Sequence, residues 1–249
     1  MAQTALFEPG GYRYVRGPFQ YSGGVAAEAG FVVERASFAR PLPIVEGFAA
    51  IEAHLKAQGR PLTAFCACEL RSPAPFTAEG FVAFNRVYVG TLERWGIFHD
   101  EENPVARSNV CPEIEPPPEP SFVAFSYTVP GSAAGPNFVV AGSAEAAEGT
   151  GSYENRIVRE GETSADALRE KACFVLDAME ARMAALGVSW GNASAVQAYT
   201  IHDLHPFLAD QIVARAAAAR GLTWHYTRPP VELLEFEMDV RGVALERML

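Results

Sequence analysis

The segment of the sequence with the clearest chemical potential is Pro104–Val110, in which Arg107 leads into an apolar strand and is followed by Ser108 and Asn109. A guanidinium held at the start of a strand can bind a carboxylate through two parallel hydrogen bonds. The hydroxyl and amide that follow are candidate substrate-binding groups. In a chain with 30 acidic residues, an ion pair between Arg107 and a surface acid is the alternative.

Two other clusters carry titratable side chains. Glu235 and Glu237 alternate in a predicted strand and therefore share one face, which is either a functional face or a solvated one. His202 and His205 flank Asp203, but no third ligand follows at a spacing typical of a metal site, and Asp203 is more simply a helix cap. The sequence therefore predicts no metal.

The charge and composition exclude several classes of protein. The chain has 20 basic and 30 acidic residues, a net charge of −10 that disfavours binding to nucleic acid or to an anionic membrane. No apolar run approaches the roughly 20 residues that span a bilayer. The first residues do not resemble a signal peptide, and 4 scattered cysteines are typical of a reducing compartment. We expect a cytoplasmic protein with no membrane or nucleic-acid partner.

An internal repeat predicts the elements that position these residues. Segments 50–59 and 178–187 read A-I-E-A-x-L-x-A-x-G and A-M-E-A-x-M-x-A-x-G, and each predicts the end of a helix with glycine as the stop. After each glycine follow a predicted strand, a Pro-Phe pair and a second helix. The order of elements predicts an α+β fold in which each half is a mixed sheet with two helices on one face.

The repeat also places the boundary between the halves. Composition alone would cut the chain in the proline-rich segment 112–120, but the repeat makes that segment a loop of the first half. We therefore predict domains 1–130 and 131–249. A small, acidic stretch at 142–152 predicts a surface loop.

Three motifs of the first half, in order over residues 17–129, resemble the RidA (YjgF) family of enamine and imine deaminases. Pro104–Ser108 resembles its P-x-A-R-S motif, and Tyr21–Val25 resembles its Y-S-Q-A-V segment with Gly23 in place of glutamine. Phe81–Tyr88 resembles its F-x-x-x-N-x-x-Y helix and aligns Asn85 with the family asparagine. The resemblance implies two tandem RidA-like (chorismate-mutase-like) domains, of which the second, lacking these motifs, is degenerate.

The resemblance also implies a reaction. Family members hydrolyse 2-imino or 2-enamino acids to the 2-oxo acid and ammonia without a metal or organic cofactor. It implies that Arg107 binds the substrate carboxylate, and that Tyr21 and Ser22 lie beside the substrate. Asn85 would orient the substrate or a loop, and the main chain after Ser108 would donate a hydrogen bond. Family members form trimers with sites between subunits, so the resemblance implies a homo-oligomer, with a trimer favoured.

One departure from the family suggests a composite site. The family places a glutamate on its last strand to position water, and the matching segment Phe122–Tyr127 has no acid. The second half has Glu235 and Glu237 there, so we predict that one of them joins Arg107 from the other half or from another chain.

The duplicated chain also resembles the deaminases of 2-aminomuconate-type acids, 2-amino-5-chloromuconate among them, in bacterial degradation of nitroaromatic compounds. A dicarboxylate substrate requires further cations, and the sequence offers Arg16, Arg35 and Arg71. Two alternatives stay open. One is an RNA-binding protein or ribonuclease, which the acidic charge disfavours. The other is a non-catalytic, chaperone-like protein that binds small carboxylates.

Overall fold

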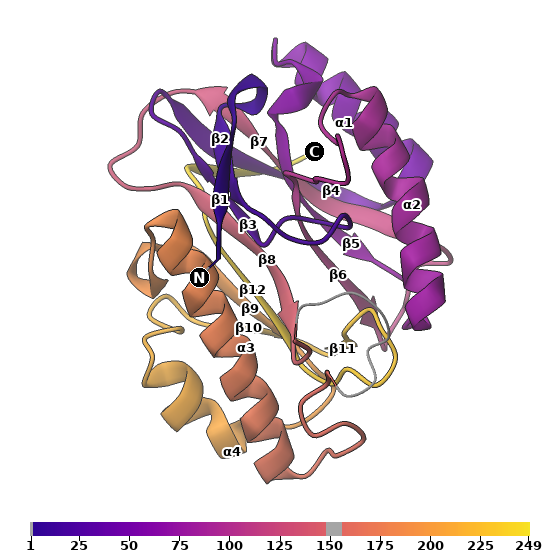
Figure 1. The fold of residues 1–249 in the computed structure, drawn as a ribbon, viewed down its shortest axis with the longest axis vertical. Helices are drawn as coiled ribbons and strands as arrows, with labels where there is room; N and C mark the ends of the chain where they lie inside the picture. Colours follow the sequence, from indigo (N-terminus) through magenta and orange to yellow (C-terminus); the bar gives the residue numbers. More distant parts are fainter. Residues whose placement is uncertain (1, 148–155) are drawn as a thin grey trace.

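The computed structural model describes residues 2–147 and 156–249, and its strands form two mixed sheets (Figure 1). The larger sheet has the order β1-β2-β3-β8-β12-β9-β10. Its neighbours are antiparallel except for β9 and β10, which are parallel. The strands are β1 (Thr4–Phe7), β2 (Tyr12–Val15), β3 (Gly24–Ala27), β8 (Phe138–Ala144), β9 (Ala195–Tyr199), β10 (Thr223–His225) and β12 (Glu237–Gly242).

The smaller sheet has the order β11-β6-β5-β7-β4-β13. The pairs β5–β6 and β4–β13 are parallel, and the other pairs are antiparallel. The strands are β4 (Phe31–Pro43), β5 (Phe65–Arg71), β6 (Ala106–Pro112), β7 (Ser121–Pro130), β11 (Thr227–Arg228) and β13 (Leu245–Met248).

Each sheet combines strands from both halves of the chain. The N-terminal strands extend the sheet of the second half, because Gly24–Ala26 of β3 pairs with Phe138–Val140 of β8. The last strand extends the sheet of the first half, because Leu245–Met248 pairs with Glu34–Ser37 of β4. Edge strands need a hydrogen-bonding partner, and here each half provides it for the other. The two halves are therefore interlocked through their sheets.

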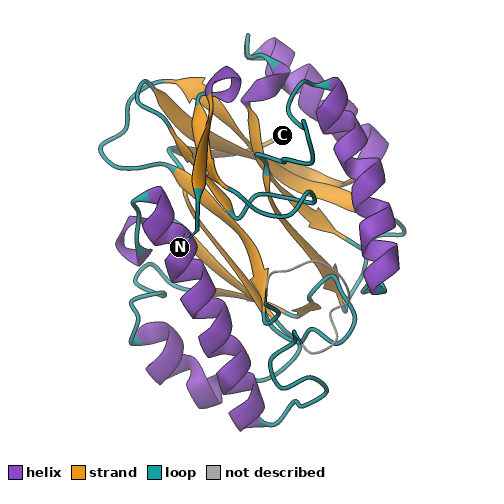
Figure 2. Ribbon diagram, viewed as in Figure 1, coloured by secondary structure: helices purple, strands orange, loops and turns teal. Residues whose placement is uncertain are grey.

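The helices cover the outer faces of the two sheets (Figures 1 and 2). They are α1 (Ile44–Ala57), α2 (Ala78–Arg94), α3 (Ala165–Leu186) and α4 (His205–Phe207), which continues into a π-helical turn at Leu208–Val213; single 3₁₀ turns lie at Glu8–Gly10, Leu62–Ala64 and Trp190–Asn192. The side-chain oxygens of Thr77 and Ser164 cap α2 and α3. Gly187 ends α3 in the left-handed conformation, as the repeat predicts. The predicted α+β class with mixed sheets is confirmed.

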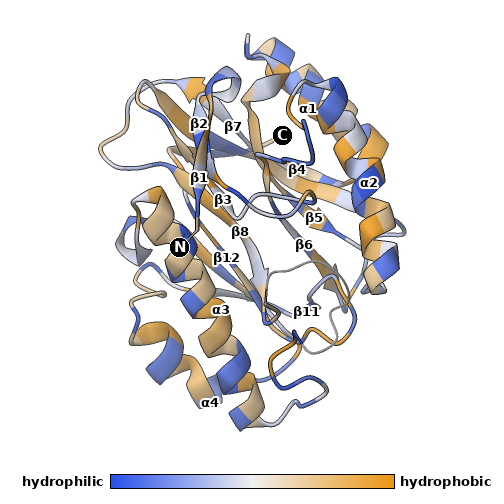
Figure 3. Cartoon of the chain, in the orientation of Figure 1, coloured by the Kyte–Doolittle hydropathy of each residue, from blue (hydrophilic) through white to orange (hydrophobic). Residues whose placement is uncertain are grey.

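Three apolar layers hold these elements together. Aromatic side chains such as Phe48 and Phe122 pack α1 and α2 onto the smaller sheet. Aliphatic side chains such as Leu176 and Val240 pack α3 onto the larger sheet. A third cluster that includes Tyr12 joins the two sheets. Figure 3 shows polar and apolar bands along the helices, as expected for helices with one buried face.

The structure corrects the loop predicted at 142–152. Gly142–Ala144 complete β8 and are paired with β12 rather than exposed in a loop. A run of small residues resembles a loop in composition, but here the small side chains let neighbouring groups approach β8 closely. Residues 148–152 of that stretch lie outside the described part of the chain.

Candidate active site

Hydrogen bonds between two loops place Tyr21 beside Arg107. The amide of Ser22 donates to the carbonyl oxygen of Val105 at 2.9 Å, and the Ser22 hydroxyl donates to that of Pro104 at 3.1 Å. Asn103 accepts from the amide of Val105 at 3.0 Å. These bonds fix the backbone just before β6 and set the direction of the Arg107 side chain. Ser22 does not line the cavity described below, so we assign it a positioning role.

The guanidinium of Arg107 is enclosed by aromatic rings. Its Cζ lies 5.5 Å from the ring centroid of Tyr21, 5.7 Å from that of Phe81, 5.6 Å from that of Phe84 and 4.8 Å from that of Tyr88. The side chain is only 3% exposed, and neither Nη atom has a hydrogen-bond acceptor among the described residues. Ring faces attract a cation but do not satisfy its donors. A buried charge without acceptors is costly, so this arrangement fits an anionic ligand.

Arg107 forms part of the wall of a cavity of about 1210 Å³ that lies between the two halves of the chain. The first half contributes β6 and α2, and the second half contributes β8, α3 and β12. Residues from both halves of the chain therefore share the wall of one cavity. The residues that line it and that the following paragraphs discuss are Tyr21, Glu79, Phe81, Glu101, Arg107, Asn109, Arg156, Ala178, Ala181, Arg182 and Glu237.

The polar residues beside Arg107 have different roles in the structure. Asn109 lines the cavity; its Oδ1 accepts from Ser72 at 3.0 Å, and its Nδ2 has no acceptor among the described residues. The Ser108 hydroxyl instead donates to Asp239 at 2.5 Å, between the sheets. Asn85 donates to the carbonyl oxygen of Phe81 at 2.6 Å and does not line the cavity. Ser108 and Asn85 therefore support the wall rather than form it.

Only one of the two predicted glutamates reaches the cavity. Glu237, 4% exposed, lines it and lies directly against Gly142 of β8. Burial raises the pKa of its carboxyl well above the ordinary value, and repulsion from Asp239 and Glu145 raises it further. Glu235 does not line the cavity; its carboxylate lies 2.8 Å from Nε2 of His202 and 3.9 Å from Nη1 of Arg228.

The backbone explains why the two glutamates separate. The predicted strand that carries both glutamates begins only at Glu237, because Leu233 adopts a left-handed conformation and residues 232–236 form a turn and irregular chain. A regular strand would place residues 235 and 237 on one face, but the irregular segment turns Glu235 toward His202. Alternation in sequence could not reveal this difference.

The cations predicted for a second carboxylate are engaged elsewhere. Arg16 pairs with Glu102, and Arg71 lies over the ring of Tyr199 at 5.6 Å. Arg35 forms two hydrogen bonds with Glu69, of 2.7 and 3.0 Å. The arginines that line the cavity together with Arg107 are instead Arg156 and Arg182. The sequence shows Arg182 only as one polar residue of a long helix, so no local signal could have identified it.

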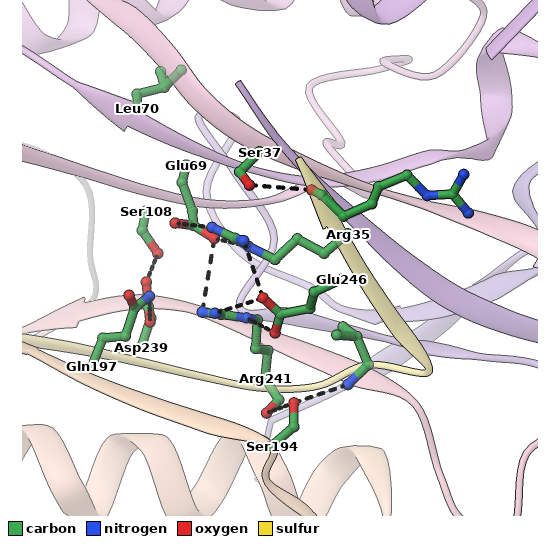
Figure 4. A network of polar contacts seen from close by, with 12 residues as sticks. Arg35, Ser37, Glu69, Leu70, Ser108, Ser194, Gln197, Asp239, Arg241 and Glu246 are labelled. Atoms are coloured by element: carbon green, nitrogen blue, oxygen red, sulfur yellow. Dashed lines mark hydrogen bonds and ion pairs between the residues drawn. The ribbon is translucent and has the colours of Figure 1, made fainter. Parts of the chain in front are cut away.

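A polar network joins the two sheets behind the cavity (Figure 4). Glu69 and Glu246 bridge Arg35 and Arg241, and Asp239 accepts from Ser108, Gln197 and Tyr199. Burial alone would raise the pKa of Glu69, but the adjacent Arg35 outweighs burial and lowers it to about 2. The network fixes β6 and β12 relative to each other, and these strands carry Arg107 and Glu237.

The described residues show no group of three His, Cys, Asp or Glu side chains that could hold a metal ion. They also contain no helix that is long and apolar enough to cross a membrane.

Comparison with known proteins gives matches at the levels of family, sequence and fold. The model of a family described as 2-aminomuconate deaminase CnbZ matches residues 4–247. A 2-amino-5-chloromuconate deaminase from Comamonas testosteroni is 51% identical over 251 residues, covering 100% of both chains. A chorismatase structure aligns with a TM-score of 0.49 and 12% identity, covering 89% of this chain and 77% of that one. E. coli TdcF with bound serine aligns with a TM-score of 0.30 and 18% identity, covering 45% and 84%. At these scores neither structural likeness supports a functional conclusion.

Proposed function

The chain belongs to the 2-aminomuconate deaminase CnbZ family, and from this premise we propose that it hydrolyses a 2-aminomuconate-type acid to the 2-oxo acid and ammonia. The observation that carries the proposal is the buried guanidinium of Arg107, whose Nη atoms have no acceptor among the described residues. The reaction is a cofactor-independent hydrolysis of a C–N bond. The resemblance to deaminases that the sequence suggests is confirmed by the family match.

Arg107 binds the carboxylate next to the amino-bearing carbon. A carboxylate can accept two parallel hydrogen bonds from Nη1 and Nη2, and the Asn109 amide supplies a further donor at the same wall. Tyr21 and Phe81 form an apolar wall around this end of the substrate. Holding the carboxylate orients C2, the carbon that water attacks, and this positioning accounts for much of the catalysis.

Glu237 moves the protons. Burial raises the pKa of its carboxyl and so favours the protonated form, which donates a proton to a carbon of the enamine and converts the C–N bond into an iminium C=N bond. The resulting carboxylate takes a proton from the water that adds to C2. The carboxyl then protonates the amine, which leaves as ammonia, and recovers a proton from the hydroxyl as C=O forms. Each catalytic cycle consumes one water molecule and regenerates the protonated carboxyl of Glu237.

The choice of Glu237 over Glu235 follows from their surroundings. The Glu235 carboxylate lies against His202, outside the cavity. Glu237 shares the cavity wall with Arg107, and burial raises the pKa of its carboxyl, which suits a group that begins the reaction as a proton donor.

The test is ammonia release from 2-aminomuconate and from 2-iminobutyrate by the wild type, Arg107→Ala and Arg107→Lys. Losing a bidentate charge-assisted contact should lower kcat/KM for Arg107→Ala by about 10²–10⁴-fold. Lysine keeps the charge but not the paired donors, so kcat/KM for Arg107→Lys should lie between the values for the wild type and Arg107→Ala. Arg94→Ala, an exposed change on α2, is the matched control.

Two results would refute the proposal. One is full activity in Arg107→Ala. The other is a wild type that binds carboxylates through Arg107 but releases no ammonia, which would indicate the non-catalytic carboxylate-binding protein that the sequence also allows.

We further propose a tandem duplication divided near residue 130, a homotrimer, a cytoplasmic location and a role in aromatic degradation, which the internal repeat, the cysteine content and the resemblance to deaminases support. Sedimentation equilibrium of the full chain tests the trimer.

A further inference from the structure

We propose that Arg182 binds the second, distal carboxylate of the substrate and makes the site selective for dicarboxylates over monocarboxylates. This inference rests on the proposed function, because it extends the same cavity. It concerns the part of the wall that α3 contributes, opposite α2.

Arg182 is built into the cavity wall rather than displayed on the surface. It is 7% exposed, and its Nη1 lies 3.3 Å from the carbonyl oxygen of Ala141 and 3.5 Å from that of Gly142. These long contacts hold the guanidinium against β8. The neighbouring positions of α3 that line the cavity are Ala178 and Ala181, whose small side chains leave room for a ligand in front of it.

Gly23 provides the space that the arginine occupies. A Cβ atom at position 23 would lie 3.3 Å from Nε of Arg182 and 3.1 Å from Cγ1 of Val15. A longer side chain there, such as the glutamine of the Y-S-Q-A-V motif, would compete with Arg182 for the same volume. The glycine at position 23, where the motif has glutamine, therefore leaves the space in which the Arg182 side chain lies.

Arg107 and Arg182 both contribute to the wall of the cavity. Both arginines are buried, and burial raises the pKa of the Glu237 carboxyl in the same wall. Glu79 and Glu101 are exposed, so water screens their charges. Two buried guanidinium groups in the wall of one cavity provide one carboxylate-binding side chain for each end of a dicarboxylate ligand.

Arg156 is the weaker candidate for the distal carboxylate. It also lines the cavity, but it is only partly buried, and its Nη1 donates to the carbonyl oxygen of Ala147 at 2.9 Å. A charge in contact with water contributes less to binding than one enclosed by protein. We therefore assign the distal carboxylate to Arg182.

The test compares two unreactive probes that differ only in the second carboxylate: muconate, a hexadienedioate, and sorbate, a hexadienoate. Calorimetry should show that the wild type prefers muconate by at least tenfold. Arg182→Gln should lose that preference while keeping its affinity for sorbate within about threefold, as expected when one charge-assisted contact is removed. Arg182→Lys should retain part of the preference for muconate. Gly23→Gln should act in the same direction as Arg182→Gln.

Arg169→Gln is the matched control, since Arg169 lies on α3 but pairs with Asp210 outside the cavity. Equal binding of muconate and sorbate by the wild type would overturn the inference, as would an equal loss of both probes in a folded Arg182→Gln.

Turnover separates the two proposals. If ammonia release depends on Arg107 but Arg182 has no role in probe selectivity, the proposed deaminase activity stands and the role of Arg182 is refuted. If selectivity depends on Arg182 but no ammonia is released, the dicarboxylate-binding site stands and the proposed deaminase activity is refuted.

Discussion

Substituting Gly142 by alanine should disable the site through Glu237 while leaving the chain folded. A Cβ atom at position 142 would overlap Oε1 of Glu237, and it would lie 3.0 Å from Cδ of Glu237 and 3.3 Å from Cα of Ser108. Carbon atoms pack at about 3.5–4.0 Å, so the carboxyl carbon must move by about 0.5–1 Å. The backbone of β6 at Ser108 cannot yield as easily as a side chain, so the carboxyl takes most of the displacement.

The expected magnitudes follow from that displacement. A misplacement of about 1 Å in a catalytic group costs about 10²-fold in rate, so kcat/KM for 2-aminomuconate should fall by about that factor. Overpacking a buried site costs about 1–3 kcal/mol, which for a chain of this length lowers Tm by about 2–12 °C. Ammonia release and thermal unfolding followed by circular dichroism measure the two effects.

Two companion variants make the measurement specific. Gly135→Ala is the control, because a Cβ atom there meets nothing within 4 Å. Adding Glu237→Gln to Gly142→Ala should cost little further activity, because both changes remove the same carboxyl from its place. A folded Gly142→Ala with wild-type kcat/KM, or full additivity in the double variant, would refute the role given to Glu237.

Three further predictions concern buried charges. Glu237→Gln should lower activity yet stabilise the fold. The native pKa of Glu237 is raised, so wild-type stability is lost as pH rises above about 4.3, where the unfolded carboxyl ionises, and the variant's advantage in urea unfolding should grow as the pH rises above that value. Matching pH slopes would contradict this. Glu69 has a native pKa lowered to about 2, mainly by Arg35, so the stability that its carboxylate contributes is present above about pH 4.3 and is lost toward pH 2. Glu69→Gln should therefore flatten the acid limb of a curve of Tm against pH. An unchanged acid limb would count against the ion pair. Lys171→Met should lower the free energy of unfolding by about 3–5 kcal/mol at pH 7, because it leaves the fully buried Glu145 carboxylate without the cation that lies 3.2 Å away. Chemical denaturation should show a smaller loss at pH 5, where Glu145 is more easily protonated.

The features that local sequence specifies were predictable. The glycine that ends α3 and the strands at β5 and β9 follow from short-range pattern, because capping and alternation depend on neighbouring residues. Arg107 and Tyr21 could be singled out because they stand in recognisable motifs. The structure brings both to one cavity wall.

The features that depend on distant partners were not predictable. Glu235 and Glu237 look equivalent in sequence, and only the irregular backbone before β12 separates them. Likewise, Arg16, Arg35 and Arg71 were as plausible as any arginine until their partners in space were known.

The sequence by itself determined the family, the α+β class and the arginine that can bind a carboxylate, because motifs and periodicity are written in residues close together along the chain. Only the tertiary structure decided that β1–β3 and β13 exchange sheets, that Glu237 passes beside Gly142 into the cavity, and that Arg182 fills the space beside Gly23. These outcomes depend on which edges pair and which volumes are left empty, and packing between segments that are distant in the sequence settles both.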